Sequence, residues 1–231
     1  MLASLACSAS LLLSACAEPA QTEAKDTTKI TDLAPYPALE KGRTATLAAK
    51  DVTATGTIDV EGKPATITIR RGENKTQATV KGPTGNYEVL GVPGYIFVKT
   101  SKKTWEKLIG TSAAAQVGNR WVVSSDQGQL STFASFVDLR TLFRTSGRIK
   151  KGKATKVNGT PSIALVDPPT NTDSTWWFAS TGEPLLLDYR NGPNTRLKFD
   201  YEQLNPITVP NPSDIADIGT LQEGSGIPTT P

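Results

Sequence analysis

The sequence has no histidine, and its two cysteines, Cys7 and Cys16, both lie near the N-terminus. Histidine is the most common general base in enzymes and the most common protein ligand of zinc. Its absence disfavours enzymes and metal sites, and the low cysteine count excludes a disulfide framework further along the chain. The formal net charge of +3 is too small to indicate a nucleic-acid partner. We therefore expect no catalytic residue, no metal and no cofactor.

An apolar run over residues 2–15 ends in Leu-Ser-Ala followed by Cys16. The run is shorter than the about 20 residues of a membrane span and is typical of a secretory signal. This ending indicates a bacterial lipoprotein signal, in which the cysteine is acylated and becomes the first mature residue. Cys7 fits less well because Ser4 stands where an aliphatic residue is wanted. An ordinary secretory signal with an incidental cysteine is the less favoured alternative.

The rest of the chain divides by composition into a tether, a folded domain and a tail. Residues 1–15 are the expected signal peptide, and 16–35 form a polar tether with a lipid (palmitate-type acyl chains) on Cys16. We expect the folded domain over 36–218 and a disordered tail over 219–231. This organisation predicts a monomer that is lipid-anchored to the cell membrane on its extracytoplasmic face.

Alternation of apolar and polar residues predicts a strand-rich domain. Short hairpin turns such as Asn191-Gly192 separate the expected strands, which lie near 52–60, 65–70, 75–81, 86–91, 94–100, 120–124, 147–157, 160–167, 174–181, 184–190 and 195–203. Helices are expected over 37–50, with Leu39, Leu47 and Ala48 buried, over 104–109, and over 130–143 behind a capping box at Asp126 and Gln129. The expected fold class is α+β, mostly β. It would be a strongly curved antiparallel sheet (a half-barrel) of about 10–11 strands with helices in its concave face.

The segment 130–143 has the broadest apolar surface of the expected helices. Its candidate lipid-binding residues are Leu130, Phe133, Phe136, Val137 and Phe143. They would either line an apolar pocket or fill the core of the sheet, since apolar helix faces are usually core. Both interpretations stay open at this level.

A basic run follows that segment, and no acidic residue occurs between Asp138 and Asp167. The candidate headgroup contacts are Arg144, Arg148, Lys150 and Lys151, which would meet anionic lipid. The alternative is a solvated edge strand, where lysines prevent pairing between sheet edges.

Four stretches together resemble the LppX/LprAFG family of bacterial lipoproteins, whose fold is the LolA-like half-barrel. They are NYEVLGVPGYIFVKTSKKTWEKL at 86–108, GNRWVVSS at 118–125, VNGTPSIALVD at 157–167 and WWFASTGEPLLLDY at 176–189. The resemblance covers about residues 36–215. It implies binding, and carriage within the cell envelope, of acylated lipids or glycolipids held in a cavity between sheet and helices, with an envelope transport partner.

A second function class stays open beside the carrier. A sensor or scaffold lipoprotein would use the same fold with a closed core and would contact a protein partner. A hydrolase is disfavoured because no histidine and no nucleophile motif are present.

Overall fold

A computed structural model of the chain describes residues 28–168 and 174–217. The expected signal peptide, Cys16 and the tail at 219–231 lie outside the described residues. The strands are β1 (Asp51–Val60), β2 (Lys63–Gly72), β3 (Lys75–Gly82), β4 (Gly85–Val92), β5 (Tyr95–Thr100), β6 (Trp121–Ser125), β7 (Lys150–Val157), β8 (Thr160–Asp167), β9 (Ser174–Ala179), β10 (Leu186–Asn191), β11 (Thr195–Asp200) and β12 (Ile215–Asp217). The helices are α1 (Pro35–Ala48), α2 (Lys102–Ile109) and α3 (Thr111–Val117), with 3-10 helices η1 (Ser131–Phe136), η2 (Leu139–Phe143) and η3 (Pro212–Asp214).

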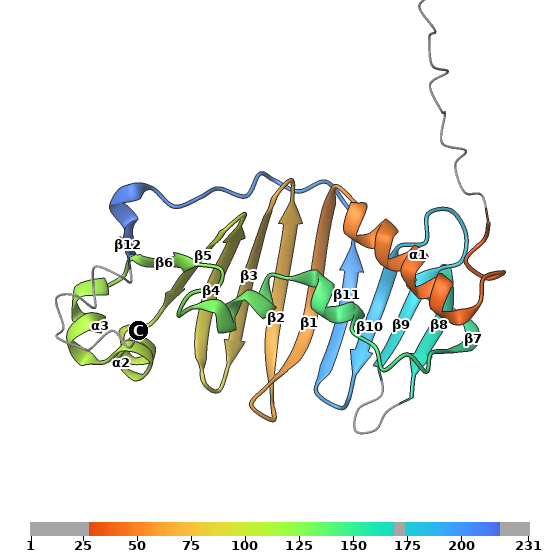
Figure 1. Cartoon of the computed structure of the whole chain (residues 1–231), viewed down its shortest axis with the longest axis horizontal. Coiled ribbons are helices and arrows are strands. Elements are labelled where there is room, and N and C mark those ends of the chain that lie inside the picture. The colour runs from red at the N-terminus through yellow and green to blue at the C-terminus, as the bar shows by residue number, and fades with distance from the viewer. Residues whose placement is uncertain (1–27, 169–173, 218–231) are drawn as a thin grey trace, which may run out of the picture.

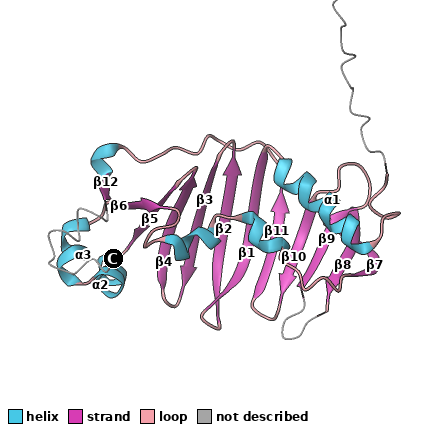
Figure 2. Ribbon diagram, viewed as in Figure 1, coloured by secondary structure: helices cyan, strands magenta, loops and turns pink. Residues whose placement is uncertain are grey.

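All described strands belong to one curved sheet that does not close on itself. The sheet has 12 strands in the order β12-β6-β5-β4-β3-β2-β1-β11-β10-β9-β8-β7 (Figure 1). Helix α1 and the two 3-10 helices η1 and η2 cross the concave face, while α2 and α3 lie at the β6 end (Figure 2). This architecture confirms the predicted mostly-β fold, a curved open sheet with helices on its concave face.

One row of aliphatic side chains runs across the concave face and explains how the strands pair in register. Ala54 of β1 lies opposite Ile69, which lies opposite Ala78 of β3. The row continues through Val89 and Val98 to Val122 of β6, and all of these residues are buried. Because side chains alternate between faces, a shift of one residue in any strand would move its part of the row into water.

The last of the described strands was not expected from the sequence. β12 adds to β6 in parallel, so that Ala216 lies opposite Val122. It makes the sheet larger than the predicted 10–11 strands and departs from a purely antiparallel pattern. Three residues are too few to show the alternation on which strand prediction depends. A parallel pair is also not joined by a tight turn, so no turn residues mark it in the sequence.

The first helix forms near the predicted position but buries a different stripe. Its buried residues include Leu39, Gly42 and Thr46, whereas Ala48 is exposed and Leu47 only half-buried. A Cβ built on Gly42 would overlap the ring of Phe178. Gly42 is therefore the residue that lets α1 lie close to β9.

The Phe-rich segment is not the α-helix that was predicted. The turn after β6, which contains the proposed capping box, leads into the 3-10 helices η1 and η2 rather than an α-helix. Between them Asp138 is extended, with φ −101° and ψ 93°, and its side chain accepts a hydrogen bond from the backbone N–H of Arg140. An Asp side chain that bonds its own backbone competes with the helical pattern, which explains the break.

Helices α2 and α3 close the β6 end of the core. Ser101 caps α2 by accepting from the backbone N–H of Thr104, and Trp105 is fully buried. Gly110 ends α2 with φ 85°, and α3 then begins. The sequence predicted the first of these helices and missed the second, since TSAAAQV carries only small or polar residues before its last position.

Candidate functional site

We call residues 130–143 the strap, because they cross the concave face of the sheet between β4 and β9 (Figure 1). Among the predicted lipid-binding residues, Leu130, Phe133 and Phe143 are buried, with only 8% of Phe133 and 6% of Phe143 exposed. Phe136 and Val137 are half-buried against the same core. The structure thus brings all five onto one apolar surface.

Aromatic rings form part of the contact between the strap and the sheet. The Phe133 ring lies 5.4 Å from that of Tyr87 on β4 and 6.2 Å from that of Phe136. The Phe143 ring stacks 6.4 Å from Phe178 on β9. Such ring pairs are non-polar. Each contributes about 0.5–1.5 kcal/mol to stability beyond the effect of the apolar area that it buries.

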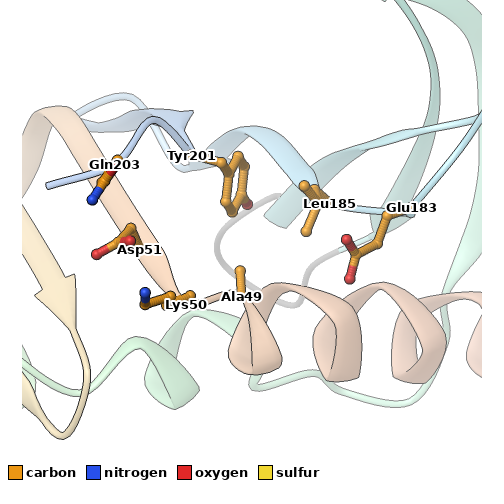
Figure 3. A pocket seen from close by; sticks show the side chains of 7 residues that line it. All are labelled: Ala49, Lys50, Asp51, Glu183, Leu185, Tyr201 and Gln203. Atoms are coloured by element: carbon orange, nitrogen blue, oxygen red, sulfur yellow. The ribbon is translucent and has the colours of Figure 1, made fainter.

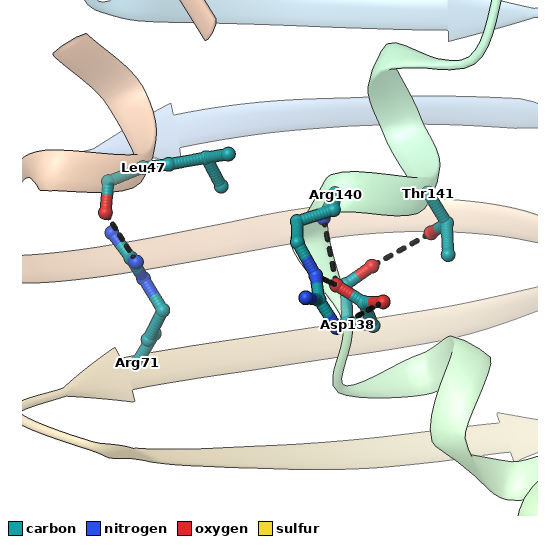
Figure 4. A network of polar contacts seen from close by, with 5 residues as sticks. All are labelled: Leu47, Arg71, Asp138, Arg140 and Thr141. Carbon is teal, nitrogen blue, oxygen red and sulfur yellow. Dashed lines mark hydrogen bonds and ion pairs between the residues drawn. The ribbon is translucent and has the colours of Figure 1, made fainter. Parts of the chain in front are cut away.

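The strap also has polar contacts, most of them within itself. Asp138 forms an ion pair with Arg140 at 2.7 Å and accepts from the backbone N–H of Arg140 at 3.0 Å (Figure 4). Burial alone would raise the pKa of Asp138, but these bonds and the positive charge of Arg140 hold it below the usual value. To the sheet, the indole Nε1 of Trp176 donates to the Leu142 carbonyl at 2.8 Å. The strap thus consists of short 3-10 turns, whose hydrogen-bond geometry is poorer than that of an α-helix, and it meets the sheet through apolar groups and one hydrogen bond.

Beside the strap, the C-terminal end of α1 is held by a side chain of the sheet. Arg71 of β2 donates to the carbonyls of Thr46, Leu47 and Ala49 at 2.9, 2.7 and 2.9 Å, and Figure 4 shows the bond to Leu47. Burial lowers the pKa of the Arg71 guanidinium. A cation at this position satisfies the last carbonyls of the helix and complements its dipole. Helix α1 is thereby joined to the sheet by three hydrogen bonds at its C-terminal end.

A hollow of about 480 Å³ opens where α1 meets the start of β1 and the end of β11 (Figure 3). It is lined by Ala49, Lys50, Asp51, Glu183, Leu185, Tyr201 and Gln203. The Tyr201 hydroxyl donates to the Leu186 carbonyl at 2.7 Å, and burial raises the pKa of this phenol. Its lining carries charges of both signs beside the apolar groups of Ala49, Leu185 and Tyr201, and such charges suit a polar group of a ligand better than an acyl chain. The sequence had not indicated this hollow, because its lining comes from three distant segments.

The predicted headgroup residues lie at the opposite end of the strap from the aromatic contacts of Phe133. Arg144 and Arg148 are exposed in the loop that leads to β7, and Lys150 and Lys151 are exposed on β7 itself. β7 is the last strand of the sheet. The structure therefore places Lys150 and Lys151 on the outermost strand, with Arg144 and Arg148 in the loop that leads to it, and the charge of Arg144 still acts on Asp138 of the strap.

Asp167, at the end of β8, holds the loop before β7 in place. Its carboxylate accepts from the side chains of Thr145 and Ser146 and from the backbone N–H of Ser146. Burial alone would raise the pKa of Asp167, but these hydrogen bonds and the nearby charge of Arg148 lower it below the usual value. The partners of Asp167 are more than 20 positions away in the sequence, so these hydrogen bonds could not be predicted from it.

Neither a helix suited to span a membrane nor a cluster of metal ligands is found where the structure can be described. No helix within residues 28–168 and 174–217 is both long and apolar enough to cross a bilayer. Over the same residues, no three acidic or thiol side chains cluster as metal ligands would.

Comparison with solved structures finds similar chains at low identity. An uncharacterized conserved protein from Thermus thermophilus has 9% identity, with 78% of this chain and 96% of that chain covered and a TM-score of 0.46. The Mycobacterium tuberculosis lipoprotein LppX has 16% identity, coverage of 73% and 98%, and a TM-score of 0.43. A chain of the Pseudomonas aeruginosa MucA/MucB complex has 17% identity, coverage of 77% and 59%, and a TM-score of 0.33.

Comparison by sequence finds no similar protein. No family model matches the chain, and no curated protein matches it. Its function therefore has to be inferred from its own residues and geometry.

Proposed function

We propose that this protein is an extracytoplasmic lipoprotein, anchored through Cys16, that binds and carries acylated lipids or glycolipids. In this proposal the acyl chains lie between the concave face of the sheet and the strap. It includes no catalytic residue and no cofactor. The observation that supports it is the attachment of the strap by aromatic rings to a sheet that remains open at both edges.

Lipid entry requires space that the closed strap does not leave, and lifting the strap would supply it. Its separable contacts with the sheet include the ring pairs of Phe133 and Phe143 and the bond from Trp176 to Leu142. The apolar groups exposed by lifting would be covered again by the acyl chains, so that the cost of opening is largely recovered. The polar hollow beside α1 offers a separate place for a small polar group of the ligand.

A second function has an observation in its favour. Phe133 and Phe143 are buried, and the strap joins the same continuous core as α1 and the sheet. A domain with this closed core would act as an envelope scaffold or sensor that contacts a protein partner. The two functions differ in whether the strap must move.

A disulfide that locks the strap separates the two functions. A Cβ built on Gly91 of β4 would lie 3.3 Å from the Cβ of Val137, close to the spacing of about 3.5–4.5 Å in disulfides. The double variant Gly91→Cys/Val137→Cys, in a Cys7→Ser/Cys16→Ser chain, should bond the strap to the sheet when oxidised.

The carrier proposal predicts that the oxidised double variant takes up no lipid and that a reductant restores uptake. The measurement is lipid extracted from the repurified protein after incubation with total envelope lipids, quantified by mass spectrometry. Phe136→Gln should also lower uptake, whereas Tyr95→Gln, an exposed ring on β5, is the matched control. Equal uptake by the oxidised and reduced forms would contradict the carrier, and so would the absence of lipid from the parent chain.

A further inference from the structure

We propose that the basic edge, defined as Arg144, Arg148, Lys150, Lys151, Lys153 and Lys156, is the surface with which the domain docks on an anionic membrane. The inference deepens the proposed function and rests on it, because it assumes the membrane anchor at Cys16. It assigns an orientation to the domain: the β7 end of the sheet faces the bilayer and the β6 end faces away.

The first observation is the exposure and position of these cations. All six side chains are exposed, and β7 closes the order of the sheet. The four lysines of β7 lie on both faces of the strand. Positive charge therefore surrounds β7 except on the side where β8 pairs with it. Lysines on an edge strand also prevent pairing with other sheets, and this purpose alone does not explain the arginines of the preceding loop.

The second observation is the charge around the edge. The Asp167 carboxylate is buried and accepts hydrogen bonds from the side chains of Thr145 and Ser146. Asp138 is paired with Arg140. Asp32 is exposed next to Thr31, and Lys29 in the same segment carries the opposite charge. The edge therefore keeps an excess of positive charge available for a partner of opposite sign.

The third observation is the place where the N-terminal segment meets the domain. Ile30 is buried in the core, and the Lys151 ammonium donates to the Thr31 carbonyl at 2.5 Å. Lys41 of α1 donates to the Thr28 carbonyl at 2.6 Å. The first described residues are thus fixed beside β7, at the right-hand end of the sheet in Figure 1.

The length of chain between the anchor and this point selects the membrane as the partner. Even fully extended, the residues between Cys16 and Thr28 span at most about 40 Å. The far edge of the sheet lies roughly 50 Å from β7 along the strand order. Chain geometry therefore favours the β7 end next to the bilayer, where anionic headgroups attract basic side chains within a Debye length of about 10 Å.

The test measures binding of the full Cys16→Ser chain to vesicles, so that the acyl anchor does not contribute. Phosphatidylcholine vesicles are compared with vesicles containing about one third phosphatidylglycerol, by co-sedimentation at low and high salt. The edge variant carries Gln at Lys150, Lys151, Lys153 and Lys156. A second variant leaves Lys151, and hence its bond to Thr31, intact. The matched control carries Gln at Lys81, Lys102, Lys103 and Lys107, which are exposed on β3 and α2.

We expect the parent and the control to bind anionic vesicles at least about tenfold more tightly than neutral ones, and salt to weaken this preference. Both edge variants should lose most of the preference while keeping the thermal unfolding midpoint of the control. Equal binding of the parent to both vesicles, or equal losses in the edge and control variants, would overturn the proposal. Lipid extracted from the edge variant should match the parent, so a failed docking surface is distinguished from a failed carrier.

Discussion

At the scale of single residues, Asp167 connects a loop to the sheet through one carboxylate. Because its pKa in the folded protein is lowered, its contribution to stability is present above the ordinary carboxyl pKa of about 4 and is lost as the pH falls further. Asp167→Asn should lower the free energy of unfolding by about 1–3 kcal/mol at neutral pH.

The pH dependence of the Asp167→Asn effect is the sharper measurement. The difference in unfolding free energy between parent and variant should shrink as the pH falls below about 4, because the parent carboxylate becomes protonated. Urea unfolding at several pH values measures it. Asp214→Asn, at an exposed position, is the control. A difference that stays constant with pH would contradict the assignment of the hydrogen bonds to the ionised form.

At the scale of elements, α1 depends on a glycine in its middle. Glycine usually destabilises a helix relative to alanine by about 1 kcal/mol, so Gly42→Ala would ordinarily stabilise. Here the added methyl would meet the fully buried Phe178 ring, and overpacking costs typically about 1–3 kcal/mol. We expect a lower unfolding midpoint in Gly42→Ala. Thr44→Ala on the exposed side of α1 should leave it unchanged or raise it, and the same result for both variants would show that the helix can shift away from β9.

The elements also show which features a sequence can reveal. The hairpins from β1 to β5 were predictable because alternation and turn residues are local signals, and Glu61 and Glu73 adopt their turns with φ 54°. The strap was mispredicted because the same apolar pattern fits two 3-10 helices once Asp138 bonds its neighbour. The burial of Gly42 could not be predicted, since it depends on a ring that is 136 positions away in β9.

The candidate site also has parts that the sequence could reveal and parts that it could not. The apolar residues of the strap and the basic edge could be named from the sequence, because each is a contiguous run. Their spatial separation could not, since it follows from the path of the chain between η2 and β7. The polar hollow and the bonds from Arg71 to the end of α1 arise from residues that meet only in the folded sheet.

At the scale of the whole molecule, the segment after β11 binds the two halves of the sheet together. It runs from β11 to β6 along one margin of the sheet (Figure 1). On the way, Ile207 is buried with Leu90 and Phe97 in a second, smaller core. Arg70 of β2 donates to the Asn205 carbonyl at 2.9 Å. The segment therefore joins strands that are far apart in the sheet order.

Ile207→Ala should destabilise the whole domain, by about 2–4 kcal/mol, through the cavity left in the smaller core. Val209→Ala is the matched control, because 43% of Val209 is exposed while only 5% of Ile207 is. Chemical unfolding followed by tryptophan fluorescence measures both. A loss in Ile207→Ala that leaves the unfolding of the main sheet unchanged would show that the segment is only an appendage.

The described chain starts beside β7 and ends on β12, which are the two outer strands of the 12-stranded sheet. The sheet is therefore also a spacer of fixed length. Strands about 4.8 Å apart make it roughly 50 Å wide along its curve. A dye attached behind β12 would lie at about that width, measured along the sheet, from the segment at Thr31 beside β7. Energy transfer from this dye to a labelled bilayer would therefore report whether the domain stands upright or lies flat.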